Sequence, residues 1–367
     1  MKKCMALLLT VITFLSVALS GNTAKASAEY QYLQNVSEQE WQNMNHVEMI
    51  EACRIPDDIL NNMSSEELLQ AFLSYPIIAD IIAFNTYRQG FETMLEESDA
   101  LRELMKREDR ASVILNYYQQ LSAAPAAKQT ATYSNMSTGW FLEILLAQPE
   151  MIDAMSEDQI KTLNETSSKK ESTRLKYPEL YQSSVYTFQR ALQENYSPSS
   201  YVSGKVKSAG TTNIPTTAIT QDGVVVRAYN RSPDFTDAEK AAQDNIFLSA
   251  YSGVTKIRTS TIKYNCHSYA YVNQSANNAF WIEDADASTC WHGIYTNSTT
   301  PVMGGKIYYG NADKGGNPGT KHSGIVNSTV SGTAYIISKW GAGPLVGHRY
   351  DKCPYYEDGT YVVYKKK

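Results

Sequence analysis

The sequence divides near residue 200 into two regions that differ in charge and in local pattern. Residues 29–200 carry 13 basic and 26 acidic side chains, whereas residues 201–367 carry 17 basic and 12 acidic ones. Such an asymmetry indicates two units of different physical type. With 367 residues, of which 43% are hydrophobic, the chain is long enough for two domains that each bury a core. Its net charge of −5 argues against a dedicated nucleic-acid binder.

The acidic region has the local signals of helix starts. A capping box places Ser or Thr three residues before Glu or Gln, so that the two side chains satisfy free amides at the first turn. Three segments match this pattern: Ser37-x-x-Glu40, Ser64-x-x-Glu67 and Ser156-x-x-Gln159. Prolines at 76, 125 and 149 divide the region into several short helices. We predict an all-helical domain over residues 29–194, in which His46 and Cys53 are ordinary packing or surface residues.

The second region begins after a segment with the composition of a linker. Residues 195–221 contain no carboxylate and are rich in Ser, Thr, Gly and Pro. A β-branched run at 224–228 then predicts a strand, and Thr236-x-x-Glu239 predicts a helix to about Ala250. Further strands are predicted at 306–309, 323–326, 334–338 and 361–364. Helices followed by strands indicate an α+β fold, with a second domain over residues 222–367.

The first 28 residues have the pattern of a signal peptide. Lys2 and Lys3 precede an apolar, uncharged run over residues 5–19, and Ala24 to Ala28 offers small residues for cleavage. The apolar run is short for a membrane span of about 20 residues. No later segment spans a membrane, since the best candidate, Ile77 to Phe84, is interrupted by Asp80. The protein is therefore predicted to be secreted, to the extracellular space or the cell wall.

Four cysteines remain after the predicted cleavage: Cys53, Cys266, Cys290 and Cys353. An oxidising compartment permits two disulfides among them, in three connectivities. Cys290 and Cys353 are predicted to form a disulfide pair or to pack separately. The spacing of Cys290, His292, His267 and Cys353 is too irregular for a zinc motif, so neither a metal nor a cofactor is predicted.

The candidate catalytic residues are Cys266 and His322. Cys266 lies in Tyr-Asn-Cys-His-Ser-Tyr-Ala, at the predicted start of a helix, where the helix dipole favours the thiolate. His322 lies in Lys-His-Ser-Gly-Ile-Val, at the predicted head of a strand. A thiolate nucleophile needs an imidazole within about 3 Å, from a residue that is usually distant in the sequence.

These segments together resemble the NlpC/P60 and CHAP branch of the papain-like cysteine peptidases. The resemblance covers roughly residues 255–365 and includes Trp281, the glycine turn at 304–307 and the strand at 334–338. It implies a papain-like domain of helix plus antiparallel sheet. Many members cut peptide or amide bonds in bacterial cell-wall peptidoglycan. By motif position, Cys266 is then the nucleophile and His322 the general base.

The residue that would orient His322 is left open by the resemblance. The family usually has a polar acceptor on the strand after the histidine, and here that strand ends in Ser338-Lys339-Trp340. A lysine ammonium has no acceptor, so Ser338 and His348 are the two candidates. The backbone amide of Cys266 is the expected oxyanion donor, with Tyr264 or Asn265 as a possible second one.

The sequence therefore predicts a secreted cysteine amidase or endopeptidase that acts on peptidoglycan or another peptide. The alternative is a catalytically silent surface or secreted protein that uses the same fold to bind a wall or host ligand. The opposite charges of the two regions also suggest that the acidic helical domain docks on the C-terminal domain and shields its cleft.

Overall fold

The computed structural model describes residues 30–195, 212–291, 293–312, 318–356 and 360–366. The predicted signal peptide at 1–28 lies outside the described residues, as does the part of the predicted linker from 196 to 211.

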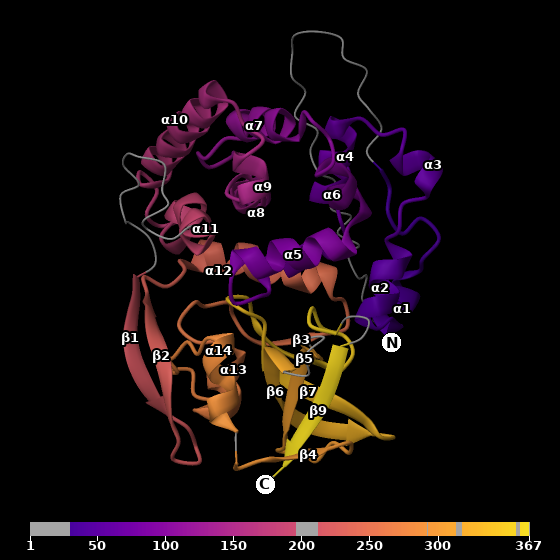
Figure 1. Ribbon diagram of the computed structural model, residues 1–367, viewed down its shortest axis with the longest axis vertical. Coiled ribbons are helices and arrows are strands. Elements are labelled where there is room, and N and C mark those ends of the chain that lie inside the picture. The colour runs from indigo at the N-terminus through magenta and orange to yellow at the C-terminus, as the bar shows by residue number, and fades with distance from the viewer. Residues whose placement is uncertain (1–29, 196–211, 292, 313–317, 357–359, 367) are drawn as a thin grey trace, which may run out of the picture.

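The described residues from 30 to 195 form helices and connecting turns, as the capping pattern predicts (Figure 1). None of the described helices is both long and apolar enough to cross a membrane. The helices of this region are α1 (Glu38–Asn43), α2 (His46–Ala52), α3 (Asp57–Leu60), α4 (Ser65–Leu73), η1 (Ile78–Ile82), α5 (Tyr87–Glu97), α6 (Asp99–Leu104), α7 (Arg110–Gln120), α8 (Gln129–Leu146), α9 (Pro149–Ile152), α10 (Glu157–Arg174), η2 (Ser183–Tyr186) and α11 (Thr187–Asn195).

The predicted capping boxes all form. At α1, α4, α10 and α12, the N-cap hydroxyl accepts from the third backbone amide and the Glu or Gln side chain returns a bond. Two further boxes, Asn45 with Glu48 at α2 and Thr86 with Gln89 at α5, follow the same geometry. Local side-chain bonds therefore fix where these helices begin.

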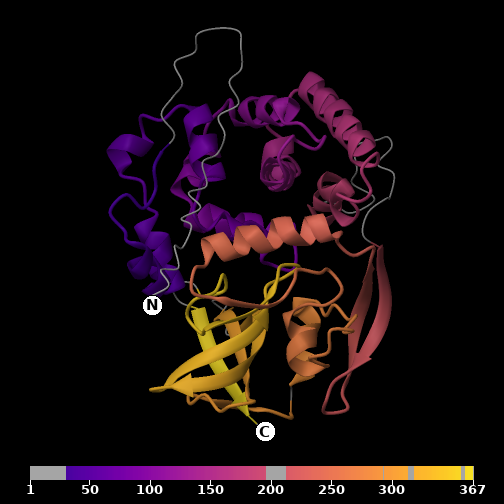
Figure 2. The ribbon, with the colours of Figure 1, turned by 180° about the vertical axis from the view of Figure 1, so that it is seen from behind.

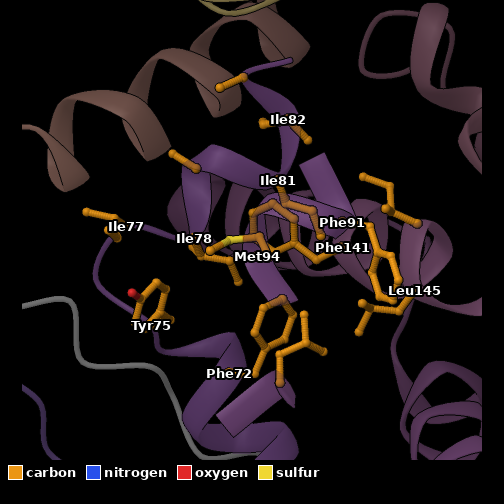
Figure 3. Packing of buried hydrophobic residues seen from close by; sticks show 14 of the residues in the cluster. Phe72, Tyr75, Ile77, Ile78, Ile81, Ile82, Phe91, Met94, Phe141 and Leu145 are labelled. Carbon is orange, nitrogen blue, oxygen red and sulfur yellow. The ribbon is translucent and has the colours of Figure 1, made fainter. Parts of the chain in front are cut away.

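The core of the helical region is built around α8, which Figures 1 and 2 show end-on among the other helices. Phe141 and Leu145 of α8 lie near Phe72 of α4 and Phe91 of α5 in a buried apolar cluster (Figure 3). The same cluster continues without a break into the C-terminal region. The two regions thus share one continuous core.

The C-terminal region is a mixture of helices and antiparallel sheet, so the α+β prediction is confirmed at this level. A hairpin of two strands stands apart from a sheet of seven described strands in the order β3-β8-β7-β6-β5-β9-β4. The elements are β1 (Thr212–Ile219), β2 (Val225–Ser232), α12 (Asp237–Ala250), β3 (Thr255–Arg258), α13 (Cys266–Tyr271), α14 (Asp284–Ala287), η3 (Ser288–Cys290), β4 (Thr296–Ser298), β5 (Lys306–Ala312), β6 (Pro318–Val330), β7 (Thr333–Lys339), β8 (Leu345–Arg349) and β9 (Thr360–Lys366).

The end of the predicted linker is part of the fold. Residues 212–219, which the sequence analysis places in the linker, form β1 and pair antiparallel with β2 from Thr212↔Ser232 to Ile219↔Val225. The β-branched Thr and Ile residues of this segment suit a strand, and Gly223 supplies the positive φ of the connecting turn. The prediction of a linker reaching residue 221 is wrong for this part.

The sheet is covered on both faces. On one face, Tyr309 and Ile336 belong to the cluster that contains Phe247 of α12, which lies between the sheet and the helical region (Figures 1 and 2). On the other face, Tyr308 of β5 packs in a second cluster with Tyr271 of α13. Paired residues of adjacent strands share a face, so His322, paired with Tyr309, and Ser323, paired with Tyr308, lie on opposite faces of the sheet.

Candidate functional site

Cys266 is the first residue of α13, as predicted. Asn265 is the N-cap residue, and its side chain accepts a hydrogen bond from the backbone amide of Ser268 at 3.3 Å. The Cys266 side chain is 1% exposed, and α13 lies against β6 and β7.

All four described cysteines are free thiols. Cys290 and Cys353 therefore pack separately and form no disulfide with each other. Cys266 forms no disulfide either, so its thiol is free to act as the predicted nucleophile.

The imidazole that contacts Cys266 belongs to its neighbour, His267. Its Nδ1 lies 2.9 Å from Ser323 Oγ, and its Nε2 lies 3.1 Å from Asp284 Oδ1. Burial alone lowers the pKa of His267, but the charge of Cys266 and hydrogen bonds to Asp284 and Cys266 raise it to about 10. Thiol, imidazole and carboxylate thus form one line, Cys266–His267–Asp284, in which the first two are buried and the carboxylate is 20% exposed.

His322 lies on the other face of the sheet. It is inside β6 and not at its head, and it pairs with Tyr309, whereas Ser323 pairs with Tyr308 and bonds His267. The ring of His322 stacks on Tyr355 with centroids 3.8 Å apart.

Neither ring nitrogen of His322 has a hydrogen-bond partner among the described residues, so the structure shows no bond between His322 and the Cys266 thiol. Burial holds the pKa of His322 well below its usual range, and His348 and His267 lower it further. The assignment of His322 as general base stays a prediction.

The two candidates for orienting His322 bond each other. Ser338 pairs with Gly324 and shares the face of His322, and its Oγ lies 2.7 Å from His348 Nε2. Burial lowers the pKa of His348 to about 4, so this imidazole is neutral near pH 7. Neither side chain forms a hydrogen bond with a ring nitrogen of His322, and the third catalytic residue stays a prediction.

Lys339 takes the opposite face from Ser338, because adjacent residues of a strand point to opposite faces of the sheet. Its Nζ donates to the carbonyl oxygens of Thr261 at 3.0 Å and Gly341 at 2.9 Å, and to that of Gly343. Burial lowers the pKa of Lys339 to about 7. The lysine therefore links the loop after β3 to the loop after β7 through hydrogen bonds, and it does not orient His322.

The two side chains proposed to assist the oxyanion have other partners. Asn265 Nδ2 donates to Ile282 O at 2.6 Å and to Asn85 Oδ1 at 3.1 Å. The Tyr264 ring stacks on Tyr269 with centroids 6.4 Å apart and lies under the Lys339 ammonium. Both side chains support the start of α13, and the backbone amide of Cys266 remains the predicted donor.

The helical region covers this site. Asn85, in the turn between η1 and α5, donates to Asp284 Oδ1 and accepts from Asn265, and Gln89 Nε2 donates to Asp284 Oδ2 at 2.8 Å. In the same turn, the carbonyl oxygen of Ala83 accepts from the Tyr355 hydroxyl. Residues 83–89, here called the cover segment, therefore bond the carboxylate behind His267 and the cap residue of α13. The cover segment thus packs against residues that adjoin Cys266, whose own exposure is 1%.

Sequence reasoning missed His267 and Asp284 as a pair. His267 follows the candidate nucleophile directly in the sequence, but the general base of a cysteine nucleophile is usually distant in the sequence, and this favours His322. No local signal connects Asp284, which follows Trp281 by three residues, to Cys266. Asn85 and Gln89 lie in the other region, about 200 residues away from Asp284.

Comparison with known proteins assigns no family. No protein-family model, no curated protein and no solved structure matches the chain.

Proposed function

We propose that the protein is an exported cysteine hydrolase with a papain-like C-terminal region. It cleaves amide bonds, and the first candidate for its substrate is bacterial cell-wall peptidoglycan. The observation that carries this proposal is the Cys266–His267–Asp284 line at the start of a helix packed on an antiparallel sheet. The order of motifs along residues 255–365 supports the papain-like reading, and the signal-like pattern at 1–28 supports export.

The proposed reaction is acyl transfer through a thioester. The Cys266 thiolate attacks the amide carbonyl carbon, and the backbone amide at the start of α13 stabilises the oxyanion. His267, held by Asp284, gives its proton to the leaving amine as the C–N bond breaks. A water molecule then gives a proton to His267 and attacks the thioester, so that the C–S bond breaks and the carboxylate product leaves.

Alkylation of the native protein tests the nucleophile. Burial raises the pKa of Cys290 and of Cys353 to about 12, and burial and nearby carboxylates raise that of Cys53. We therefore expect iodoacetamide to modify Cys266 faster than these three internal controls at pH 7, as measured by peptide mass spectrometry. Wall peptides should slow the modification. Modification of Cys266 at or below the rate of Cys290 would contradict the proposal.

The second candidate is a catalytically silent binding protein of the same fold. The 1% exposure of Cys266 and the unbonded nitrogens of His322 favour it. This function requires the wild-type protein to bind wall peptides without turnover, and Cys266→Ser to bind them equally well. Turnover of any muropeptide would exclude it.

Loosening the cover segment is expected to speed the modification of Cys266. The double variant Asn85→Ala/Gln89→Ala removes side-chain bonds to Asp284 and Asn265, each worth about 1 kcal/mol. We expect an increase in the alkylation rate of about 10- to 30-fold. Because these bonds are part-buried or buried, raising the salt concentration of wild type should not reproduce the effect.

Asn62→Ala is the matched control for this experiment, since Asn62 is an exposed amide that donates to the nearby Asp58 carbonyl. It should leave the alkylation rate of Cys266 unchanged. An equal rate in the double variant and in wild type would show that the cover segment does not limit access.

A further inference from the structure

A second cluster of ligand-type side chains lies in the helical region, away from Cys266. His46 is the first residue of α2, Asp80 lies in η1, and Glu97 is the last residue of α5. All three are buried, with exposures of 0%, 0% and 4%. Three segments that are separate in the sequence therefore direct one imidazole and two carboxylates into the same interior space.

The donor atoms of this cluster converge. His46 Nε2 lies 2.8 Å from Asp80 Oδ2 and 3.7 Å from Glu97 Oε1. One ligand atom from each of the three residues lies within 4.8 Å of the other two. Ligands at about 2.0–2.2 Å from a zinc ion are separated from one another by about 3–4.4 Å. Small side-chain adjustments therefore suffice to place all three around one ion.

The surrounding residues hold these groups in the orientation that a metal ligand needs. His46 Nδ1 lies 2.7 Å from the backbone carbonyl oxygen of Tyr356, which leaves Nε2 directed at the carboxylates. The Tyr251 hydroxyl lies 2.7 Å from both oxygens of Asp80. Metal-binding histidines and carboxylates are commonly oriented by such outer hydrogen bonds.

We propose that His46, Asp80 and Glu97 bind a divalent cation, with Zn²⁺ as the ion that best suits one imidazole nitrogen and two carboxylate oxygens. The site is structural, because it is buried and joins α2, η1 and α5. Through Tyr251 at the end of α12 and Tyr356, it also ties the helical region to the C-terminal region. This inference does not rest on the proposed hydrolase activity.

Metal binding by the full-length protein tests the proposal. The Cys266→Ala background removes the candidate nucleophile as a competing zinc ligand. After treatment with EDTA and dialysis, titration calorimetry with Zn²⁺ should give one equivalent of bound ion, and the melting temperature should rise by several degrees. Absence of a stoichiometric ion together with an unchanged melting temperature would overturn the proposal.

Substitution of each carboxylate ligand by the amide of the same shape tests whether Zn²⁺ binds at this cluster. Glu97→Gln and Asp80→Asn each remove one negative ligand, and we expect each to weaken Zn²⁺ binding by at least about 100-fold. Glu92→Gln is the matched control, since Glu92 lies on the same helix but is exposed and pairs with Arg88. It should bind Zn²⁺ as the background protein does. Unchanged affinity in both test variants would overturn the site.

X-ray absorption of zinc bound to the background protein gives a test that needs no ligand variant. The expected first shell contains nitrogen and oxygen at about 2.0–2.2 Å, with one imidazole. A sulfur shell at about 2.3 Å would place the ion on cysteine and would also overturn the proposal.

Discussion

Cys266→Ala is expected to lower amide hydrolysis by on the order of 10⁴-fold or more, to below detection, because loss of a nucleophile removes the covalent route altogether. The change removes one sulfur atom from a buried helix start, so the fold should survive. The measurement is release of new amino groups from purified peptidoglycan by wild type and variant, with circular dichroism melts as the control for folding. Retained cleavage by Cys266→Ala would exclude Cys266 from the mechanism.

The same assay separates the two imidazoles. His267→Gln keeps a polar side chain beside Asp284 but has no titratable nitrogen, so we expect a loss similar to that of Cys266→Ala. His322→Phe keeps a ring stacked on Tyr355 and removes only nitrogens that have no bond among the described residues. We expect it to retain activity within about threefold. The reverse result would make His322 the base, in agreement with its motif position.

Helix starts were predictable from the sequence because capping is decided within four residues. Ser64 and Glu67 satisfy each other's neighbouring amides whatever the rest of the chain does. The Thr86–Gln89 box has the same pattern and was available to the same reasoning. By contrast, β1 depends on pairing with β2, and its Thr-rich sequence also suits a linker.

The candidate site was predictable only in its local part. The sequence places Cys266 at the start of α13, since Asn265 is a good cap and an apolar helix follows. The face of His322 depends on the register of β5 with β6, and a shift of one residue would reverse it. The contact of Asn85 with Asp284 joins distant segments, and no pattern of spacing or charge predicts it.

Charge asymmetry also gave an incomplete account of how the two regions meet. It suggests electrostatic docking, whereas the contacts include a shared apolar core with Phe247 and Trp340. Neutral amides contribute as well, as in the bond from Asn265 to Asn85. Such buried contacts respond weakly to salt, so ionic strength should affect the surface of the acidic region more than this junction.

The position of α10 depends on a buried ion pair. The side chains that α10 buries are Leu163, Ser167, Lys170 and Arg174, so its inner face is mostly polar. Arg174 lies 2.8 Å from Glu143 of α8, and the two side chains are 4% and 1% exposed. The Tyr118 hydroxyl donates to the same carboxylate at 2.7 Å. Apolar burial alone does not hold α10, and the charged pair must contribute to its docking.

Arg174→Met is therefore expected to destabilise the protein by about 3–5 kcal/mol, because it leaves the Glu143 carboxylate buried without its cation. Urea unfolding followed by circular dichroism measures the loss. Hydrogen exchange should show the earliest opening in α10 and in η2, whose Ser184 and Val185 carbonyls accept from Arg174. Lys106→Met, at an exposed pair with Glu103, is the control and should cost no more than about 1 kcal/mol.

A double variant tests whether the loss of stability in Arg174→Met comes from the unpaired Glu143 carboxylate. In Arg174→Met/Glu143→Leu both charges are replaced by apolar side chains, so the desolvation cost of the pair disappears with its attraction. We expect the double variant to recover at least half of the stability that Arg174→Met loses, even though the Tyr118 hydroxyl then loses an acceptor. If both variants were equally unstable, the packing of the arginine between α8 and α10 would account for the loss, and not the unpaired carboxylate.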